Sequence, residues 1–313
     1  MVNVFDGVIS VLKGGPGSER EVSLRSAASV SAALKRAGMQ VREVDVASSD
    51  WQVPGDMEFA FNMIHGTFGE DGQVQALLEA AGVPYTGEGV EGSRKAFDKF
   101  LTKECFDAKG IPTASWEVLE LGQQPRMQVP LVLKAPCQGS SVGVYIVKDA
   151  GQLEAAMAGV REFTDRVLVE KFVVGRELTV GILGDRILPI VEILTPDGVY
   201  DFRNKYPWLT AGGASEHLCP APLDEALAKK VGEVALAAHR ALGLEVYSRV
   251  DVLLPDTGEP IVLEVNTIPG MTESSLLPDA AKQAGIDFEA LCTEIVSLSQ
   301  SRFSRRKQIA ELS

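Results

Sequence analysis

Two apolar segments that flank a glycine-containing turn constrain the fold of this chain more than any other feature. Residues 250–254 and 260–265 are predicted strands, joined by the turn sequence Pro-Asp-Thr-Gly. The resulting hairpin places Asp251 across from Glu264, with Asn266 on the same face as Glu264. Mg²⁺ prefers such oxygen ligands and shares its coordination with substrate phosphates. A polar hairpin edge without a metal is the alternative interpretation of this segment.

The length, charge and cysteine pattern exclude several classes of protein. With 313 residues, the chain is expected to fold as two or three subdomains. The formal net charge of −13 argues against binding to nucleic acid or an anionic membrane, although a local cationic pocket could hold a nucleotide. Four separated cysteines without a C-x-x-C pair indicate neither a zinc site nor a disulfide framework. No signal-peptide pattern or membrane-spanning run is found, so a cytoplasmic location is expected.

The first 92 residues have the pattern of a parallel α/β unit. A strand at residues 8–12 is followed by a glycine-rich loop, a helix at about 23–37 and a strand at 41–46, which is a βαβ arrangement. A third strand at 59–64 leads through another glycine-rich loop into a helix at about 73–81. This part is therefore expected to form a Rossmann-like subdomain.

The rest of the chain has an antiparallel α+β pattern. Helices are expected on either side of residues 110–112 and at about 224–242. Strands are expected in two pairs, at residues 131–134 with 144–147 and at residues 167–172 with 177–183. The predicted subdomains are residues 1–92, 93–180 and 181–303, followed by a tail at residues 304–313. The chain after Ser301 is rich in serine, arginine and lysine and is expected to be frayed.

Two glycine-containing loops are candidate anion sites. Residues 138–143 (Gln-Gly-Ser-Ser-Val-Gly) lie between predicted strands, where backbone N–H groups and serine hydroxyls suit a phosphate. They do not form a P-loop, and a plain hairpin is the alternative. The first loop of the chain lacks the third glycine of a dinucleotide fingerprint, and Glu19 and Glu21 beside it are explained more simply as partners of a helix dipole.

Other polar positions are open to two interpretations from the residues alone. Glu170 at a strand end forms either a surface salt bridge or part of a hinge that binds a flat heterocycle. His65 in a glycine-rich loop is more often a structural hydrogen-bonding residue than a catalyst, and Lys134 on a strand is more often a solvated surface group. Residues 205–219 lie in an irregular stretch that is long enough for a lid.

Six segments in a fixed order form a specific combination. They are Gly14-Gly15 with Glu19-Arg20-Glu21-Val22-Ser23; His65-Gly66-Thr67-Phe68-Gly69-Glu70-Asp71-Gly72; Gly139-Ser140-Ser141-Val142-Gly143; Tyr200-Asp201 with Lys205-Tyr206; Arg249-Val250-Asp251; and Glu264-Val265-Asn266-Thr267 with Pro269-Gly270-Met271-Thr272 and Ser275-Leu276. Together they resemble the D-alanine:D-alanine ligase family of ATP-grasp enzymes, over nearly the whole chain to about Phe303. The resemblance implies an ATP-grasp fold, in which the central and C-terminal subdomains enclose ATP.

The resemblance also implies roles at the substrate sites. Glu19 matches an acid near the ammonium group of the first D-alanine, and His65 matches a histidine near the same substrate. Ser140 and Tyr206 match the partners of Glu19 in a hydrogen-bonded triad that ties the lid to the site. Arg249 and the Gly270 N–H match the oxyanion site of the family. Ser275 and Leu276 match its pocket for the carboxylate of the second D-alanine.

A nucleotide and metal site is implied in the same way. The phosphate-contacting lysines match Lys99, Lys134 and the lid residue Lys205. The adenine hinge and the ribose acid match Glu170, Lys171, Val173 and Glu177. The ligands of Mg²⁺, with two ions expected and Mn²⁺ as a substitute, match Asp251, Glu264 and Asn266.

The implied activity is ATP-dependent joining of two D-alanines through a D-alanyl phosphate, for peptidoglycan synthesis, in an expected homodimer. A ligase for D-lactate or D-serine as second substrate is the nearest alternative, and Tyr206 favours an amine. The lid at residues 206–219 is longer than usual, and Cys137 and Gln138 replace a more usual polar or acidic pair.

Two alternatives come from other classes of protein. The first is a regulatory protein that binds a nucleotide without turnover. Such a protein would have no need to retain Arg249, Asp251, Glu264 and Asn266, so their presence argues against it. A dinucleotide-dependent oxidoreductase is opposed by the missing glycine of the first loop.

Overall fold

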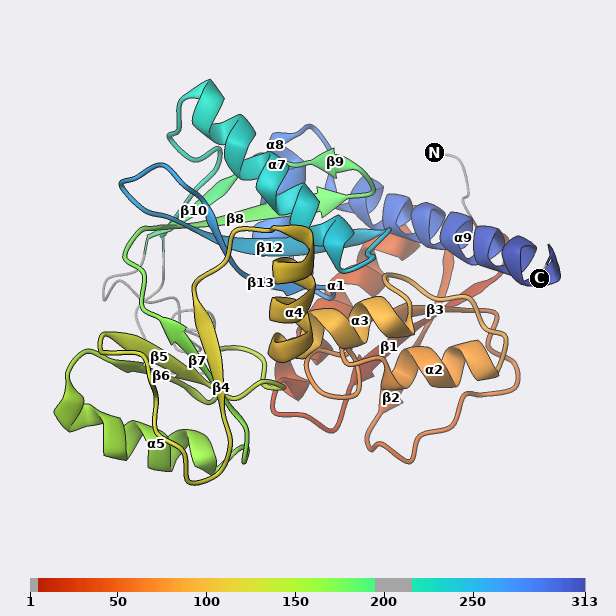
Figure 1. Cartoon of the computed structure of the whole chain (residues 1–313). Helices are drawn as coiled ribbons and strands as arrows, with labels where there is room; N and C mark the ends of the chain where they lie inside the picture. The colour runs from red at the N-terminus through yellow and green to blue at the C-terminus, as the bar shows by residue number, and fades with distance from the viewer. Residues whose placement is uncertain (1–4, 195–215, 313) are drawn as a thin grey trace.

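Three β-sheets build the molecule in the computed structural model, which describes residues 5–194 and 216–312 (Figure 1). The strands are β1 (Val8–Gly14), β2 (Gln40–Val46), β3 (Phe59–Asn62), β4 (Trp116–Leu119), β5 (Leu131–Lys134), β6 (Val144–Val147), β7 (Val167–Lys171), β8 (Arg176–Leu183), β9 (Arg186–Ile187), β10 (Val191–Leu194), β11 (Glu216–Leu218), β12 (Tyr247–Leu254) and β13 (Ile261–Asn266). The helices are α1 (Arg20–Arg36), α2 (Gln73–Ala80), α3 (Val90–Phe97), α4 (Lys99–Lys109), η1 (Ala150–Gln152), α5 (Leu153–Arg161), α7 (Glu225–Ala241), α8 (Leu276–Gln283) and α9 (Phe288–Leu312). None of the helices in these residues is long and apolar enough to cross a membrane.

The first sheet is parallel, in the order β2-β1-β3, and confirms the predicted βαβ arrangement. Ser23 in the first turn of α1 accepts a hydrogen bond from the Gly14 N–H (2.8 Å) and donates one to the Met63 carbonyl (2.6 Å). Strand β3 ends at Asn62, earlier than predicted, because the Asn62 amide donates to the Gly69 carbonyl (3.0 Å) and turns the chain into a loop. These polar contacts fix the loops at the carboxyl ends of the strands, where the candidate site lies.

The second sheet is antiparallel, in the order β4-β7-β5-β6, and forms a separate lobe with α5 (Figure 1). The prediction of a helix after residues 110–112 was wrong, because β4 follows there and pairs with β7. Gly110 has φ 67°, a left-handed conformation that ends α4. Trp116 and Val118 of this strand are apolar and alternate with Glu117, and Leu119 at its end is buried.

The third sheet has the order β11-β10-β8-β12-β13, with β9 against β8. The prediction that residues 167–172 and 177–183 form a strand pair was wrong, because β7 belongs to the second sheet and β8 lies between β10 and β12. Strand β8 also runs across the predicted boundary between residues 180 and 181. One face of β8 packs in the core beneath α7, and α8 covers the other.

The C-terminal helix α9 continues to Leu312, so the prediction of a frayed tail after residue 301 was wrong. Arg302 is buried, with its guanidinium carbon 4.7 Å from the centre of the Tyr85 ring. Arg305 and Arg306 each form an ion pair of 3.1 Å with Glu245. These contacts hold the helix against the rest of the molecule as far as Arg306.

Candidate active site

A cavity of about 660 Å³ is lined by residues from the regions around all three sheets. The predicted site residues in its wall are Glu19, His65, Lys99, Ser140, Glu170, Arg249, Glu264, Asn266, Gly270, Ser275 and Leu276. Lys134 and Asp251 contact members of this set from behind the wall. Lys171, Val173 and Glu177 are not part of the lining. The predicted lid residues Lys205 and Tyr206 lie outside the described residues.

The hairpin of β12 and β13 has the predicted register, with Asp251 paired to Glu264 and Arg249 to Asn266. Asp251 is buried, and its Oδ1 accepts hydrogen bonds from Arg249 Nε (2.9 Å) and Thr179 Oγ1 (2.7 Å). Its Oδ2 accepts from Arg249 Nη2 (2.9 Å) and Asn266 Nδ2 (3.2 Å). Arg249 and Asp251 are two residues apart on one strand, so their side chains share a face and form a bidentate pair.

The donor set of the hairpin fits Mg²⁺ in the presence of a phosphate. Asp251, Glu264 and Asn266 offer two carboxylates and one amide on adjacent strands. In residues 5–194 and 216–312, no cluster of three or more histidine, cysteine or acidic side chains could hold a metal alone. Mg²⁺ is commonly held by one or two carboxylates together with substrate phosphates, which this set allows. The four lone-pair positions of Asp251 already accept hydrogen bonds, so a metal ligated there would displace one donor.

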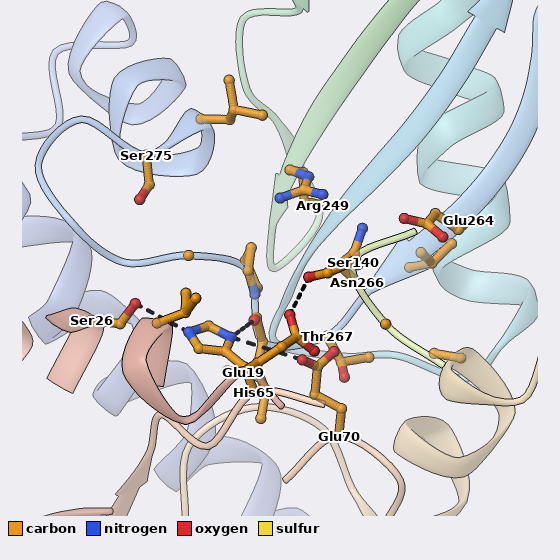
Figure 2. A pocket seen from close by; sticks show the side chains of 18 of the residues that line it. Glu19, Ser26, His65, Glu70, Ser140, Arg249, Glu264, Asn266, Thr267 and Ser275 are labelled. Carbon is orange, nitrogen blue, oxygen red and sulfur yellow. Dashed lines mark hydrogen bonds and ion pairs between the residues drawn. The ribbon is translucent and has the colours of Figure 1, made fainter. Parts of the chain in front are cut away.

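Glu19 lies at the start of α1 and faces the loop between β5 and β6, as Figure 2 shows. Its carboxylate is buried and accepts a hydrogen bond from the Ser140 hydroxyl. A Cβ atom at Gly66 or Gly139 would lie 2.6 or 2.5 Å from Glu19 Oε2, so both glycines are needed for this close approach. Ser140 itself has φ 50°, an unusual value for a non-glycine residue that turns its hydroxyl-bearing loop toward Glu19.

His65 is buried in the cavity wall beside a second carboxylate. Its Nδ1 lies 2.8 Å from the Ile268 carbonyl oxygen, and its Nε2 lies 3.1 Å from Ser26 Oγ. Glu70 Oε1 lies 3.8 Å from Nδ1 and accepts a hydrogen bond from the Gly66 N–H (2.8 Å). Burial raises the pKa of Glu70, and the charge of nearby Glu19 adds to this effect. His65 therefore has the hydrogen-bonding structural role that the sequence favoured, and it has this role in the wall of the cavity.

Glu170 forms the centre of a buried charge cluster at the other end of the cavity. Its Oε1 lies 2.5 Å from Lys103 Nζ, and its Oε2 is paired with Lys134. Burial acts to raise the pKa of Glu170, but the ammonium groups of Lys134 and Lys103 outweigh it and hold the pKa below its ordinary value. Lys103 also donates to Thr113 Oγ1 (2.5 Å), and burial lowers the pKa of Lys103. Since Glu170 is only 2% exposed, the interpretation as a surface salt bridge is excluded.

Lys99 lies one turn before Lys103 on α4 and donates to the Gln138 carbonyl (2.7 Å). Burial lowers the pKa of Lys99. The lysine therefore connects the start of α4 to the glycine-containing loop that reaches Glu19. The arrangement places a cation next to a loop whose glycines and serines suit a phosphate.

Ser275 is the N-cap residue of α8, which begins at Leu276. Its Oγ accepts a hydrogen bond from the Thr272 N–H (3.0 Å) and lies 2.8 Å from Thr272 Oγ1. The free N–H groups of a helix N-terminus attract a negative charge, so this end of the cavity suits a carboxylate.

Several residues of the site were missed from the sequence. Lys103 could have been found by its spacing, since residues i and i+4 of a helix lie on one face and Lys99 was a candidate. Glu70 lies within a recognised motif but had no assigned role. Ser26 and Thr179 gave no signal, because a serine in a helix and a threonine in a strand are common.

Comparisons with known proteins identify the family of the chain. The sequence models of the D-ala D-ala ligase N-terminus and C-terminus match residues 46–88 and 105–297. The D-alanine–D-alanine ligase of Methylacidiphilum infernorum is 45% identical over 295 residues, which cover 94% of this chain and 96% of the relative. That of Geobacter sulfurreducens is 45% identical over 296 residues, covering 92% of each chain. The crystal structure of the Bacillus anthracis ligase complexed with ATP superposes with a TM-score of 0.81 at 30% identity, covering 96% of this chain and 100% of that one. The chain therefore belongs to the D-alanine–D-alanine ligase family.

Proposed function

We propose that this protein joins two D-alanine molecules into D-alanyl-D-alanine at the expense of ATP, for peptidoglycan synthesis. The observation that carries the proposal is that a buried acid, a guanidinium and a cluster of lysines converge on one cavity. An amide bond cannot form directly from a carboxylate, because oxide is a poor leaving group. Transfer of the γ-phosphoryl group of ATP to the carboxylate of the first D-alanine gives an acyl phosphate and ADP. The amine of the second D-alanine attacks the acyl carbon, and phosphate leaves as the amide bond forms.

The nucleotide is proposed to bind at the end of the cavity that contains Glu170. Lys171 and Val173 are assigned to the hinge whose backbone contacts the adenine, and Glu177 is assigned to the ribose. Lys99 and Lys134, with the lid residue Lys205, would hold the phosphates by charge and hydrogen bonds. Asp251, Glu264 and Asn266 would hold Mg²⁺, with two ions expected and Mn²⁺ as a substitute. When bound, the metal would offset negative charge on the phosphoryl oxygens.

The two amino acids are proposed to bind on either side of Arg249. Glu19, held by Ser140, accepts the ammonium group of the first D-alanine, with His65 nearby and Tyr206 completing the triad. The carboxylate of the second D-alanine lies at Ser275 and Leu276, where α8 begins.

Arg249 and the Gly270 N–H stabilise the oxyanion of the tetrahedral intermediate. One such donor typically contributes about 2.7–4 kcal/mol to the transition state. A lid over the cavity would keep water away from the acyl phosphate, because water would otherwise hydrolyse this intermediate.

The organisation around this site is proposed as three subdomains in a cytoplasmic homodimer. The first boundary is proposed near residue 92. The sequence predicted the second boundary at residue 180, but β8 pairs with β12 over its length, so we place the second boundary in the connection at residues 172–175. Gel filtration with light scattering would test the dimer.

Phosphate release from Mg-ATP tests the proposed activity directly. The enzyme is incubated with D-alanine alone, with D-alanine and D-lactate, with D-alanine and D-serine, and with L-alanine, and products are identified by mass. D-alanyl-D-alanine with D-alanine alone, and no phosphate with L-alanine, is the expected result. A mixed product formed in preference to D-alanyl-D-alanine would assign the alternative second substrate, and no turnover with any D-amino acid would reject the proposal.

A further inference from the structure

The loop that carries Gly270 has no helix or strand of its own. It connects the end of β13 at Asn266 to the start of α8 at Leu276. An N–H group in such a segment points in a defined direction only if the neighbouring backbone is fixed by other contacts. The position of the proposed oxyanion donor therefore depends on whatever holds residues 268–271.

Two side chains from the first subdomain hold this loop on both sides of Gly270. Before it, the Ile268 carbonyl oxygen lies 2.8 Å from His65 Nδ1. After it, the Met271 N–H donates to Ser26 Oγ at 3.3 Å. Ser26 lies on α1 and His65 follows β3, and Figure 2 shows their side chains meeting beside the loop. Neither side chain belongs to the part of the chain that forms the hairpin with Arg249.

One placement of the protons gives every hydrogen bond of this network a donor and an acceptor. A carbonyl oxygen can only accept, so His65 Nδ1 carries the proton that is donated to Ile268. In the neutral ring Nε2 then accepts the Ser26 hydroxyl proton across 3.1 Å. The Ser26 oxygen remains an acceptor for the Met271 N–H. The chain of bonds thus begins and ends on the same loop, with only Pro269 and Gly270 between its two ends.

Proline adds to this constraint. The ring of Pro269 fixes its φ angle. The hydrogen bond at Ile268 therefore restricts the position of Gly270 as well. Gly270 would otherwise be the most flexible residue of the loop. A Cβ atom at Gly270 would also lie 3.1 Å from Ser275 Oγ, which leaves no room for a more rigid residue without movement.

We propose that Ser26 is a positioning residue, which acts through His65 and Met271 to hold the Gly270 N–H where the oxyanion forms. The inference rests on the proposed function and adds to it a residue that contacts no reacting atom. Ser26 is fully buried, and its hydroxyl is shared between the first subdomain and the catalytic loop. The first subdomain thereby contributes to stabilising the transition state as well as to binding a substrate.

A mutation that removes only this hydroxyl tests the proposal. Ser26→Ala is compared with Ser31→Ala, which removes another buried hydroxyl from the same helix but does not touch the loop. Because displacement of a catalytic group by about 1 Å can cost about 100-fold, we expect Ser26→Ala to lower kcat by about tenfold or more. The KM values for ATP and D-alanine should stay within about twofold, since ground-state contacts are kept. Ser26→Thr, which keeps the hydroxyl, should recover part of the loss.

Two further measurements separate positioning from a general structural role. The affinity for a phosphinate dipeptide, whose tetrahedral phosphorus imitates the intermediate, should fall in Ser26→Ala in parallel with kcat/KM. Hydrogen exchange at Met271 should become faster in Ser26→Ala than in Ser31→Ala. Equal losses in the two alanine variants, or an unchanged affinity for the phosphinate, would overturn the inference while leaving the proposed function intact. An inactive wild-type enzyme would instead reject the proposed function, and the role of Ser26 with it.

Discussion

Asp251 and Glu170 are both buried carboxylates of the candidate site, but different kinds of structure hold them. The donors to Asp251 come from its own strand and from the two strands beside it, at the register positions of Arg249, Thr179 and Asn266. Glu170 is held by Lys134, from strand β5 beside its own strand β7, and by Lys103, which reaches it from α4. The first site follows from strand register alone, whereas the second also requires a helix to pack beside the sheet.

The difference lies in how many partners can be lost. Asp251 accepts hydrogen bonds at all four of its lone-pair positions, and half of them come from one guanidinium. Glu170 has two cationic partners, Lys103 and Lys134, so removal of one leaves the other. We therefore expect the strand-based site to be the more sensitive to loss of its central acid, and the lysine cluster to tolerate loss of a single member.

The largest effect is expected for Asp251→Ala. The mutation removes the buried carboxylate that faces the guanidinium of Arg249, whose side chain is only 13% exposed. Breaking a buried pair in this way costs about 3–5 kcal/mol. The free energy of unfolding, measured by urea denaturation, should fall by that amount, and ligase activity should be lost. Asp256→Ala in the exposed turn of the same hairpin is the control and should be nearly neutral. A loss below about 1 kcal/mol would show that the pair does not stabilise the hairpin.

The same contrast explains what could be predicted from the sequence. The register of the hairpin follows from two apolar segments and a turn, so the placement of Asp251 opposite Glu264 was predicted correctly. The approach of Lys103 to Glu170 requires α4 to pack beside β7, and no local pattern encodes that distance. The pairing of β8 was missed for the same reason, because residues 172–175 look like a hairpin turn but connect two sheets.

A smaller effect is expected for Lys103→Met. Glu170 keeps Lys134, so the loss should be limited to that of one hydrogen-bonded partner of a charged group, about 1.5–3 kcal/mol. The KM for ATP should rise if the cluster orders the nucleotide end of the cavity. Lys109→Met, on the exposed last turn of the same helix, is the matched control. A loss as large as that of Asp251→Ala would remove the distinction between the two sites.

Thr179→Val tests the redundancy of the strand-based site. The valine keeps the shape of the side chain but removes the hydroxyl that donates to Asp251 Oδ1 at 2.7 Å. Arg249 and Asn266 still donate to the carboxylate, so we expect a loss of only about 0.5–1.5 kcal/mol. Combined with Lys103→Met, the effects should add, because the two clusters share no partner. A coupling energy above about 0.5 kcal/mol would mean that the clusters are linked through the cavity.

The smallest effect concerns the pH dependence of the lysine cluster. In the folded protein, the pKa of Glu170 lies below its ordinary value of 4.5, because the two ammonium groups outweigh its burial. Such a group contributes stability that is present above its unfolded pKa and is lost as the pH falls through the folded pKa. Lys103→Met makes the pKa of Glu170 less depressed, so its destabilisation should be constant from pH 7 to about pH 5 and shrink only as the pH falls through the folded pKa of Glu170 in the variant. The gap in unfolding free energy between the two proteins should shrink by at most about 1.4 kcal/mol for each unit by which the mutation raises the folded pKa of Glu170. Urea denaturation of both proteins from pH 7 to pH 3.5 measures this difference. A gap that stays constant down to pH 3.5 would mean that Lys134 alone holds the pKa of Glu170 as low as both lysines do.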